Sequence, residues 1–206
     1  MSEPRTRARG IRRLAPGLLH WTIRDERIRF RSDAYAVGGR DGRVLIDPLP
    51  LTGKALSRLG VVAAICLTGS CHQRSAWRYR RRFGAPVYAP RGSRGLDERP
   101  DRLYGRGARL PGGLVAIHAP GPTRVHFALH LARGRGALFC ADVLMRRGKG
   151  LGFVPDEHQD DPPRTRRTAA AFLKRRFAAL CCAHGAPIVG GARMAIRRAL
   201  AADGEK

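Results

Sequence analysis

Short apolar runs dominate the first third of the chain. Residues 44–46 and 61–67 are continuous apolar runs bounded by turn residues, which is typical of strands buried on both faces. Residues 18–23, 28–30 and 33–37 cluster or alternate as short strands do, and a Gly-Gly-Arg-Asp-Gly turn follows them. The pattern therefore predicts a β-meander that leads into two buried strands.

Helix-like and strand-like segments alternate through the rest of the chain. The predicted helices cover residues 51–59, 75–83, 164–177 and 191–202. The predicted strands cover residues 86–88, 114–118, 125–131, 137–140 and 179–183. Residues 91–111 are rich in Arg, Gly and Pro and are predicted to form a loop with one short strand. Because no regular strand–helix–strand repeat connects these elements, they favour a sandwich of two sheets flanked by helices.

Length and composition are those of one globular domain. The 206 residues suffice for one sizeable core, and 43% of them are hydrophobic. We expect a single domain over residues 17–202, preceded by a basic, flexible tail at 1–16. No apolar run approaches the roughly 20 residues of a membrane span, and the N-terminus lacks the apolar stretch of a signal peptide. A cytoplasmic location without a membrane partner is the expectation.

The cysteines are odd in number and most lie in apolar segments, unlike a secreted disulfide framework. They are Cys66, Cys71, Cys140, Cys181 and Cys182. We expect reduced thiols. Cys181 and Cys182 are adjacent in a predicted strand, so their side chains should enter opposite faces of a sheet.

Positive charge is the most pronounced feature of the composition. Lysine and arginine number 40 against 16 aspartates and glutamates, which gives a formal net charge of +24. The basic residues are spread along the chain without a nucleic-acid motif or interleaved aromatic residues, and the densest patch, at 78–82, is predicted to be an exposed helix face. We interpret the charge as a solvated surface with non-specific polyanion binding. A nucleic-acid-associated protein is the less favoured alternative.

Residues able to do chemistry follow the predicted strands. The longest such segment is Ile-Cys-Leu-Thr-Gly-Ser-Cys-His-Gln-Arg-Ser-Ala-Trp at 65–77. The others are Val-Leu-Ile-Asp-Pro at 44–48, Ala-Pro-Gly-Pro-Thr at 119–123, Leu-Phe-Cys-Ala-Asp-Val-Leu at 138–144 and Ala-His-Gly-Ala-Pro-Ile at 183–188. Taken in order, they resemble the metallo-β-lactamase-fold superfamily of metal-dependent hydrolases, over nearly the whole chain. The resemblance implies an α+β fold, an αββα sandwich of two mixed β-sheets flanked by helices.

The resemblance also implies where metal ligands belong, and most of those positions are changed. In the family an H-x-H-x-D-H loop follows a buried strand. Here Gly69 and Cys71 stand at its first two histidines. Gln73 and Arg74 stand at its aspartate and its last histidine, and Pro122 stands at the histidine of a P-G-H-T turn. Of these residues, only Cys71 could bind a metal.

Two other ligand positions of the family are retained. Asp142 stands at the aspartate that bridges two zinc ions, and His184 stands in the late turn that supplies the last histidine. With Cys71 they are the candidate metal ligands and the candidate catalytic residues, and they would hold at most one zinc ion, or none. Arg74 brings a permanent charge into the space of the second ion. We therefore predict that Arg74 replaces that ion and pairs with Asp142.

Cys71 leaves three interpretations open. It could complete a zinc site, act as a nucleophile paired with a histidine, or be a small buried thiol at a vacated ligand position. His72 falls at a spacer position and should point away from Cys71 if the chain is extended, although helix or turn geometry would override that alternation.

Further residues are expected around these ligands. Asp47 follows a buried strand, where the resemblance implies support of the metal loop, and it could equally cap the turn before Pro48. His126 lies four residues beyond Pro122, where the family carries a non-ligand histidine; otherwise it is a strand surface residue. The expected surrounding residues are Asp47, His72, Gln73, Arg74, Pro122 and His126.

The acidic segment Pro-Asp-Glu-His-Gln-Asp-Asp, at 155–161, contrasts with the basic chain around it. Its residues 156–161 could bind a metal or a cationic substrate, or could favour the following helix through its dipole.

Two functions follow from the resemblance. The first is a hydrolase that cleaves an ester, thioester, amide or phosphodiester, with a small-molecule substrate in a cleft and a degenerate centre that is mononuclear or metal-free. The alternative is a non-catalytic ligand-binding or regulatory protein that keeps the pocket and has lost the metal. Fold alone does not decide between them.

Overall fold

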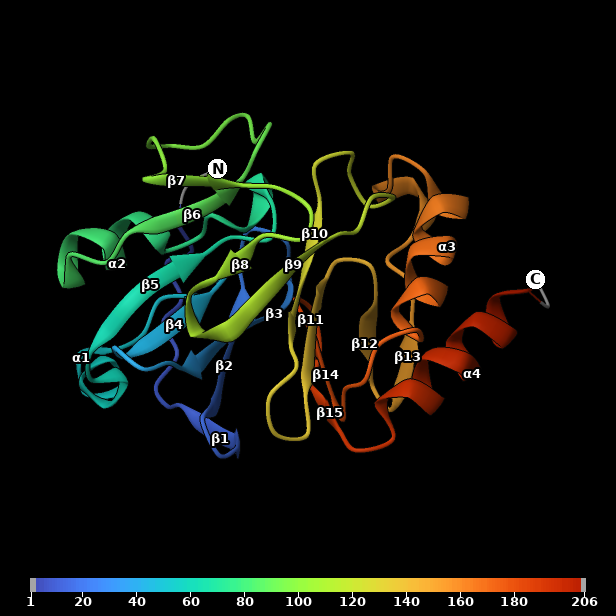
Figure 1. The fold of residues 1–206 in the computed structure, drawn as a ribbon, viewed down its shortest axis with the longest axis horizontal. Helices are drawn as coiled ribbons and strands as arrows, with labels where there is room; N and C mark the ends of the chain where they lie inside the picture. The colour runs from blue at the N-terminus through green and yellow to red at the C-terminus, as the bar shows by residue number, and fades with distance from the viewer. Residues whose placement is uncertain (1–2, 205–206) are drawn as a thin grey trace.

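The computed structural model describes residues 3–204, and two β-sheets form the centre of the fold (Figure 1). The first sheet has seven strands in chain order: β1 (Arg12–Ala15), β2 (Leu18–Asp25), β3 (Phe30–Gly38), β4 (Arg43–Ile46), β5 (Val62–Cys66), β6 (Val87–Pro90) and β7 (Arg102–Tyr104). Strands β1 to β4 pair antiparallel, and β4 to β7 pair parallel. The predicted meander thus leads into a mixed sheet.

The second sheet has six strands and is also mixed. Their spatial order is β15 (Ile188–Val189), β14 (Ala179–Cys182), β11 (Ala137–Ala141), β10 (Phe127–Leu131), β9 (Leu114–His118) and β8 (Arg109–Leu110). Only the pair β11 and β14 is parallel. A separate hairpin of β12 (Met145–Arg147) and β13 (Gly150–Gly152) was not predicted.

Helices cover the outer face of each sheet, which confirms the αββα sandwich (Figure 1). The α-helices are α1 (Gly53–Leu56), α2 (Ala76–Phe83), α3 (Pro162–Phe172) and α4 (Ala192–Gly204). The 3₁₀ turns are η1 (Ser57–Leu59), η2 (Ser70–His72), η3 (Pro111–Gly113) and η4 (Asp156–His158). Helices α1 and α2 pack on the first sheet, and α3 and α4 pack on the second. Among residues 3–204, no helix has the length and apolar character needed to span a bilayer.

Side-chain alternation along the strands builds three apolar layers. In β3, Ala34 packs toward α1 and α2, whereas Tyr35 packs between the sheets. In β14, Cys181 lies between the sheets and Cys182 lies under α3 and α4. The two cysteines therefore enter opposite faces, as predicted. Because the central layer receives side chains from both sheets, it fixes their relative position.

The N-terminal segment differs from the flexible tail that we expected over residues 1–16. Residues 1 and 2 lie outside the described part, but β1 extends the first sheet within this range. Ala8 is 5% exposed, and its backbone exchanges hydrogen bonds with Pro50 and Thr52. The many arginines of this segment indicated a solvated tail, but backbone hydrogen bonds do not depend on the side chains. From Ala8 onward, the segment belongs to the domain.

Leu129 tests the central layer, because it is fully buried between the sheets. Leu129→Ala should lower the free energy of unfolding by about 2–5 kcal/mol, through lost apolar burial and the cavity that remains. Val61→Ala is the control, since Val61 is 70% exposed and should change stability by less than about 0.5 kcal/mol. Urea denaturation measures both. Equal effects of the two substitutions would contradict a packed layer between the sheets.

Candidate functional site

The candidate residues gather at one edge of the sandwich, where strands of both sheets end. Asp47 directly follows β4, Asp142 directly follows β11, and His184 lies two residues beyond β14. Strands β4 and β5 are parallel, as are β11 and β14, so their carboxyl ends share an edge within each sheet. Asp47, Asp142 and His184 therefore lie at one edge of the sandwich, as the resemblance implied.

Two backbone hydrogen bonds fasten the sheets to each other at this edge. The amide of Phe127, on the second sheet, donates to the Thr68 carbonyl at 2.9 Å. The amide of Asp33, on the first sheet, donates to the Ala183 carbonyl at 2.8 Å. These bonds fix the relative position of the two backbones from which the side chains of the site project.

Asp47 holds the loop that carries Cys71 and His72. Its Oδ1 accepts a hydrogen bond from the Thr68 amide at 2.8 Å, and its Oδ2 accepts one from the Thr68 hydroxyl at 2.6 Å. Asp47 is only 4% exposed, so these bonds satisfy a buried carboxylate. In the sequence, Thr68 is marked only by its place at the end of an apolar run, directly before the motif loop.

The 3₁₀ turn η2 sets the directions of Cys71 and His72. Extended backbone would point neighbouring side chains to opposite sides, and on that basis we expected His72 to point away from Cys71. In a 3₁₀ turn successive residues are instead about 120° apart. The loop is therefore the turn geometry that we expected to override the alternation, and both side chains face Asp142.

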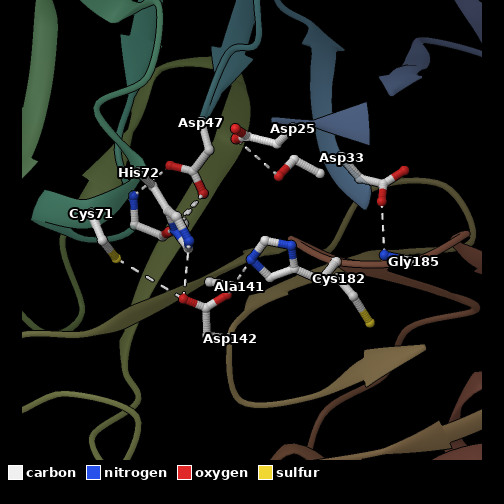
Figure 2. Close-up of polar contacts among 12 residues, drawn as sticks. Asp25, Asp33, Asp47, Cys71, His72, Ala141, Asp142, Cys182 and Gly185 are labelled. Atoms are coloured by element: carbon white, nitrogen blue, oxygen red, sulfur yellow. Dashed lines mark hydrogen bonds and ion pairs between the residues drawn. The ribbon is translucent and has the colours of Figure 1, made fainter. Parts of the chain in front are cut away.

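His72 lies between two carboxylates (Figure 2). Its Nε2 is 3.0 Å from Asp142 Oδ2, and its Nδ1 is 3.3 Å from Asp47 Oδ2. Burial acts to lower the pKa of His72, but the surrounding negative charge, chiefly that of Asp142, raises it well above the ordinary value. Burial likewise acts to raise the pKa of Asp142, and the neighbouring histidines, His72 first, hold it well below its usual range.

Cys71 and His184 approach the Asp142 carboxylate from other sides. Cys71 Sγ is 4.0 Å from Oδ2, and His184 Nε2 is 3.4 Å from Oδ1. One donor atom each of Cys71, His72 and Asp142 lies within 4.8 Å of the other two. Cys71 is exposed, which excludes the interpretation of a buried thiol. The predicted ligands Cys71 and His184 thus both face Asp142, the third, and His72 contacts it as well.

A buried network holds His184 in place. Its Nδ1 is 2.8 Å from the Arg31 carbonyl, and the amide of Gly185 donates to Asp33 Oδ2 at 2.8 Å. Asp33 also accepts hydrogen bonds from Arg31 and lies 2.7 Å from His20 Nε2. Burial lowers the pKa of His184. Sequence reasoning missed Asp33 and His20, which lie in early strands far from the motif.

Arg74 does not pair with Asp142, so that prediction was wrong. Its Nη1 donates instead to the backbone carbonyls of Asp33 at 2.8 Å and Asp47 at 3.1 Å. Arg74 is 3% exposed and has a left-handed φ of 38°. Its guanidinium therefore joins β3 to the end of β4, and His72 is the basic residue that contacts Asp142.

His126 positions Asp142 through the backbone. Its Nδ1 lies 3.0 Å from the Ala119 carbonyl, and its Nε2 accepts a hydrogen bond from the Asp142 amide at 3.2 Å. Burial lowers the pKa of His126 to about 4, which keeps the ring neutral. Both ring nitrogens are engaged, so His126 is neither a metal ligand nor the surface residue that we had considered.

Gln73 and Pro122 form hydrogen bonds with other parts of the fold and not with Asp142. The Gln73 amide accepts from Trp77 Nε1 at 2.7 Å and donates to Asp97 Oδ1 at 3.2 Å, which ties α2 to the following loop. The Pro122 carbonyl accepts from the amide of Asp160 at 3.1 Å. In the same acidic segment Asp161 caps α3. That cap accords with a role at the helix N-terminus for residues 156–161.

The comparisons with known proteins concern the fold. No family model matches the sequence, and no curated protein matches it. Among solved structures, DIM-1 metallo-β-lactamase has 14% identity and a TM-score of 0.76, over 96% of this chain and 98% of that one. A metallo-β-lactamase from Pontibacter korlensis has 15% identity and a TM-score of 0.74, over 95% and 99%. One from Erythrobacter litoralis has 17% and 0.68, over 95% and 92%. This chain therefore has the metallo-β-lactamase fold.

Proposed function

We propose that this protein is a metal-dependent hydrolase whose centre holds one zinc ion. The proposed ligands are Cys71, His72 and Asp142, with His184 at the second oxygen of Asp142. The observation that carries the proposal is the convergence of metal-binding side chains on Asp142. Two imidazole nitrogens face Asp142, and one oxygen of that carboxylate is buried without a hydrogen bond among the described residues.

Hydrogen bonds around Thr68 fix a proton on His72. The Thr68 hydroxyl has a single hydrogen, which it donates to Asp47 Oδ2 at 2.6 Å. The same hydroxyl oxygen is 2.7 Å from His72 Nδ1, so it accepts there and Nδ1 carries the N–H. Because the pKa of His72 is raised, zinc would have to displace the proton on Nε2, and the lone pair left there would face the ion beside Asp142. A carboxylate that orients a histidine in this way is common behind metal ligands.

His184 is oriented by the same principle. A carbonyl oxygen can only accept, so His184 Nδ1 donates its N–H to Arg31 at 2.8 Å. The Nε2 lone pair of the neutral ring then faces Asp142 Oδ1 across 3.4 Å. Two acceptors facing each other in a buried place repel unless a cation or a proton compensates them. This pair supports a cation at the site.

The donor set suits zinc, and it suits one ion rather than two. A thiolate, imidazoles and a carboxylate are the ligand types that zinc takes in proteins. Gly69 and Pro122 carry no donor side chain, and Gln73 is engaged by Trp77 and Asp97. When bound, zinc would supply a water activated at neutral pH and a Lewis acid for hydrolysis.

The remaining residues orient this centre and leave one side of it open. Asp47 acts on His72 through Thr68, and His126 fixes the backbone of Asp142. Cys71 is exposed, so we place the approach of a small-molecule substrate on its side. The substrate class is an ester, thioester, amide or phosphodiester, each of which is cleaved by water at an electrophilic carbon or phosphorus.

One observation favours the alternative of a metal-free, ligand-binding protein. His72 Nε2 lies within hydrogen-bond distance of Asp142, at 3.0 Å. If both nitrogens carry protons, the imidazolium itself compensates the two carboxylates that flank it. The pocket would then bind a ligand without hydrolysing it.

Zinc content separates the two functions. Protein purified without added zinc should contain about one ion per chain, and His72→Ala or Asp142→Asn should abolish that stoichiometry. His118→Ala is the matched control, because His118 is exposed and, among residues 3–204, its ring contacts only the Arg124 carbonyl and the Phe127 ring. Mass spectrometry of the metal measures all four proteins. A wild-type protein without zinc, even after incubation with the metal, would favour the metal-free alternative.

Hydrolysis tests the activity itself. The zinc-loaded protein should cleave at least one activated substrate, such as p-nitrophenyl acetate or bis(p-nitrophenyl) phosphate, and Asp142→Asn should slow cleavage by about a hundredfold or more. Release of p-nitrophenol is followed by absorbance, again with His118→Ala as the control. Equal rates for wild type and Asp142→Asn would show that the cleavage arises outside this centre.

Thr68 offers a test of how His72 is oriented. Thr68→Val keeps the shape of the side chain but removes the hydroxyl between Asp47 and His72. It should weaken zinc binding by about 10- to 100-fold and lower the free energy of unfolding by about 1–3 kcal/mol. Thr68→Ser retains the hydroxyl and should keep most of the affinity. Competition with a zinc-binding dye gives the affinities. Equal losses in both variants would contradict the hydroxyl relay.

A further inference from the structure

A second site lies away from the zinc ligands, in a hollow between β9 and α3. The hollow encloses about 790 Å³, and five cationic side chains line it with the exposed ring of His118. The cations are Arg106, Arg164, Arg167, Lys174 and Arg175. All five are exposed, and the lining contains no aspartate or glutamate. We call this hollow the α3 groove.

Four of the cations form a stripe along one helix. Arg164 and Arg167 lie on α3, and Lys174 and Arg175 lie just past its end, where hydrogen bonds to Ala171 and Phe172 continue the helical turn. Steps of three and four residues keep side chains on one helix face. At a rise of about 1.5 Å per residue the stripe is roughly 16 Å long. The charges are thus arranged in a row.

No acidic partner among the described residues neutralises the five cations of the groove. Within residues 3–204, no carboxylate lies within ion-pair distance of any of the five side chains. Arg166, on the same helix, pairs with Asp156 and Asp203. The densest patch in the sequence, at 78–82, is also partly neutralised, because Glu3, Glu98 and Asp101 pair with its arginines. The α3 groove therefore gathers five unneutralised cations around one hollow.

We propose that the α3 groove binds the phosphate backbone of a single-stranded nucleic acid. A row of cations suits a chain of phosphates better than a single small anion, which would need the charges to converge on one point. A flexible single strand can follow a hollow surface. His118 is the only exposed aromatic ring in the lining, so base stacking is limited and binding should show little sequence preference.

Oligonucleotide binding tests the groove independently of zinc and hydrolysis. The probes are fluorescein-labelled single strands of twelve thymidines and of twelve mixed nucleotides, followed by fluorescence anisotropy over a range of salt concentrations. The groove variant is R164Q/R167Q/R175Q. At 0.1 M salt it should bind roughly 100-fold more weakly than wild type, and the slope of log affinity against log salt should fall by about 2, at about 0.7 per lost phosphate contact.

The matched control removes the same charge elsewhere. R24Q/R58Q/R82Q changes three exposed arginines outside the groove, so both triple variants have the same net charge. The control should bind within about threefold of wild type, and circular dichroism should show that both variants are folded. Equal losses in the two variants would overturn the proposal in favour of diffuse charge attraction. Absence of wild-type binding, tighter binding of a duplex of equal length, or displacement by millimolar inorganic phosphate would also overturn it.

Discussion

The geometry of the site depends on how two carboxylates from different sheets, one buried and one partly buried, are compensated. Asp47 follows a strand of the first sheet and Asp142 a strand of the second, and the His72 ring lies between them. Removing a carboxylate from water costs several kcal/mol unless a partner compensates it. His72 and the Thr68 hydroxyl provide that compensation for both acids. The contact that satisfies the charges therefore also fixes the distance between the two sheet edges, and with it the space in which a cation can lie.

Backbone strain is concentrated at the same edge. In the described part of the chain, four non-glycine residues have positive φ: Arg29, Asp47, Arg74 and Ala141. Three of them adjoin the site, and each costs about 1–3 kcal/mol and persists only where its surroundings enforce the conformation. Here they do, because the Asp47 carboxylate is held by Thr68 and the Arg74 guanidinium by two carbonyls. The turn at Ala141 lets the next residue present its amide to His126 and its carboxylate to His72.

The sequence was informative wherever local pattern decides the structure. Apolar runs located most of the strands, and the resemblance of the segments that follow them implied that Asp47, Asp142 and His184 belong to one site. Side-chain direction inside the motif loop was not readable in this way. It depends on the 3₁₀ turn at Cys71 and His72 and on the left-handed backbone of Arg74, which are stabilised by contacts with distant strands. The predicted pair of Arg74 with Asp142 failed for that reason. The motif placed Arg74 near the site, but its guanidinium binds two backbone carbonyls and His72 contacts Asp142.

The distribution of surface charge was also not readable from the sequence, because it depends on ion pairs between distant residues. The same distribution links the two proposed sites. Arginine density along the chain singled out residues 78–82, but acidic residues distant in sequence neutralise much of that patch. The chain has only 16 acidic residues for 40 basic ones. Asp25, Asp33 and Asp47 are almost fully buried and are thereby removed from the surface. A site built on buried carboxylates in so basic a chain leaves few acids for the outer helices, and the uncompensated stripe on α3 is a consequence of that shortage.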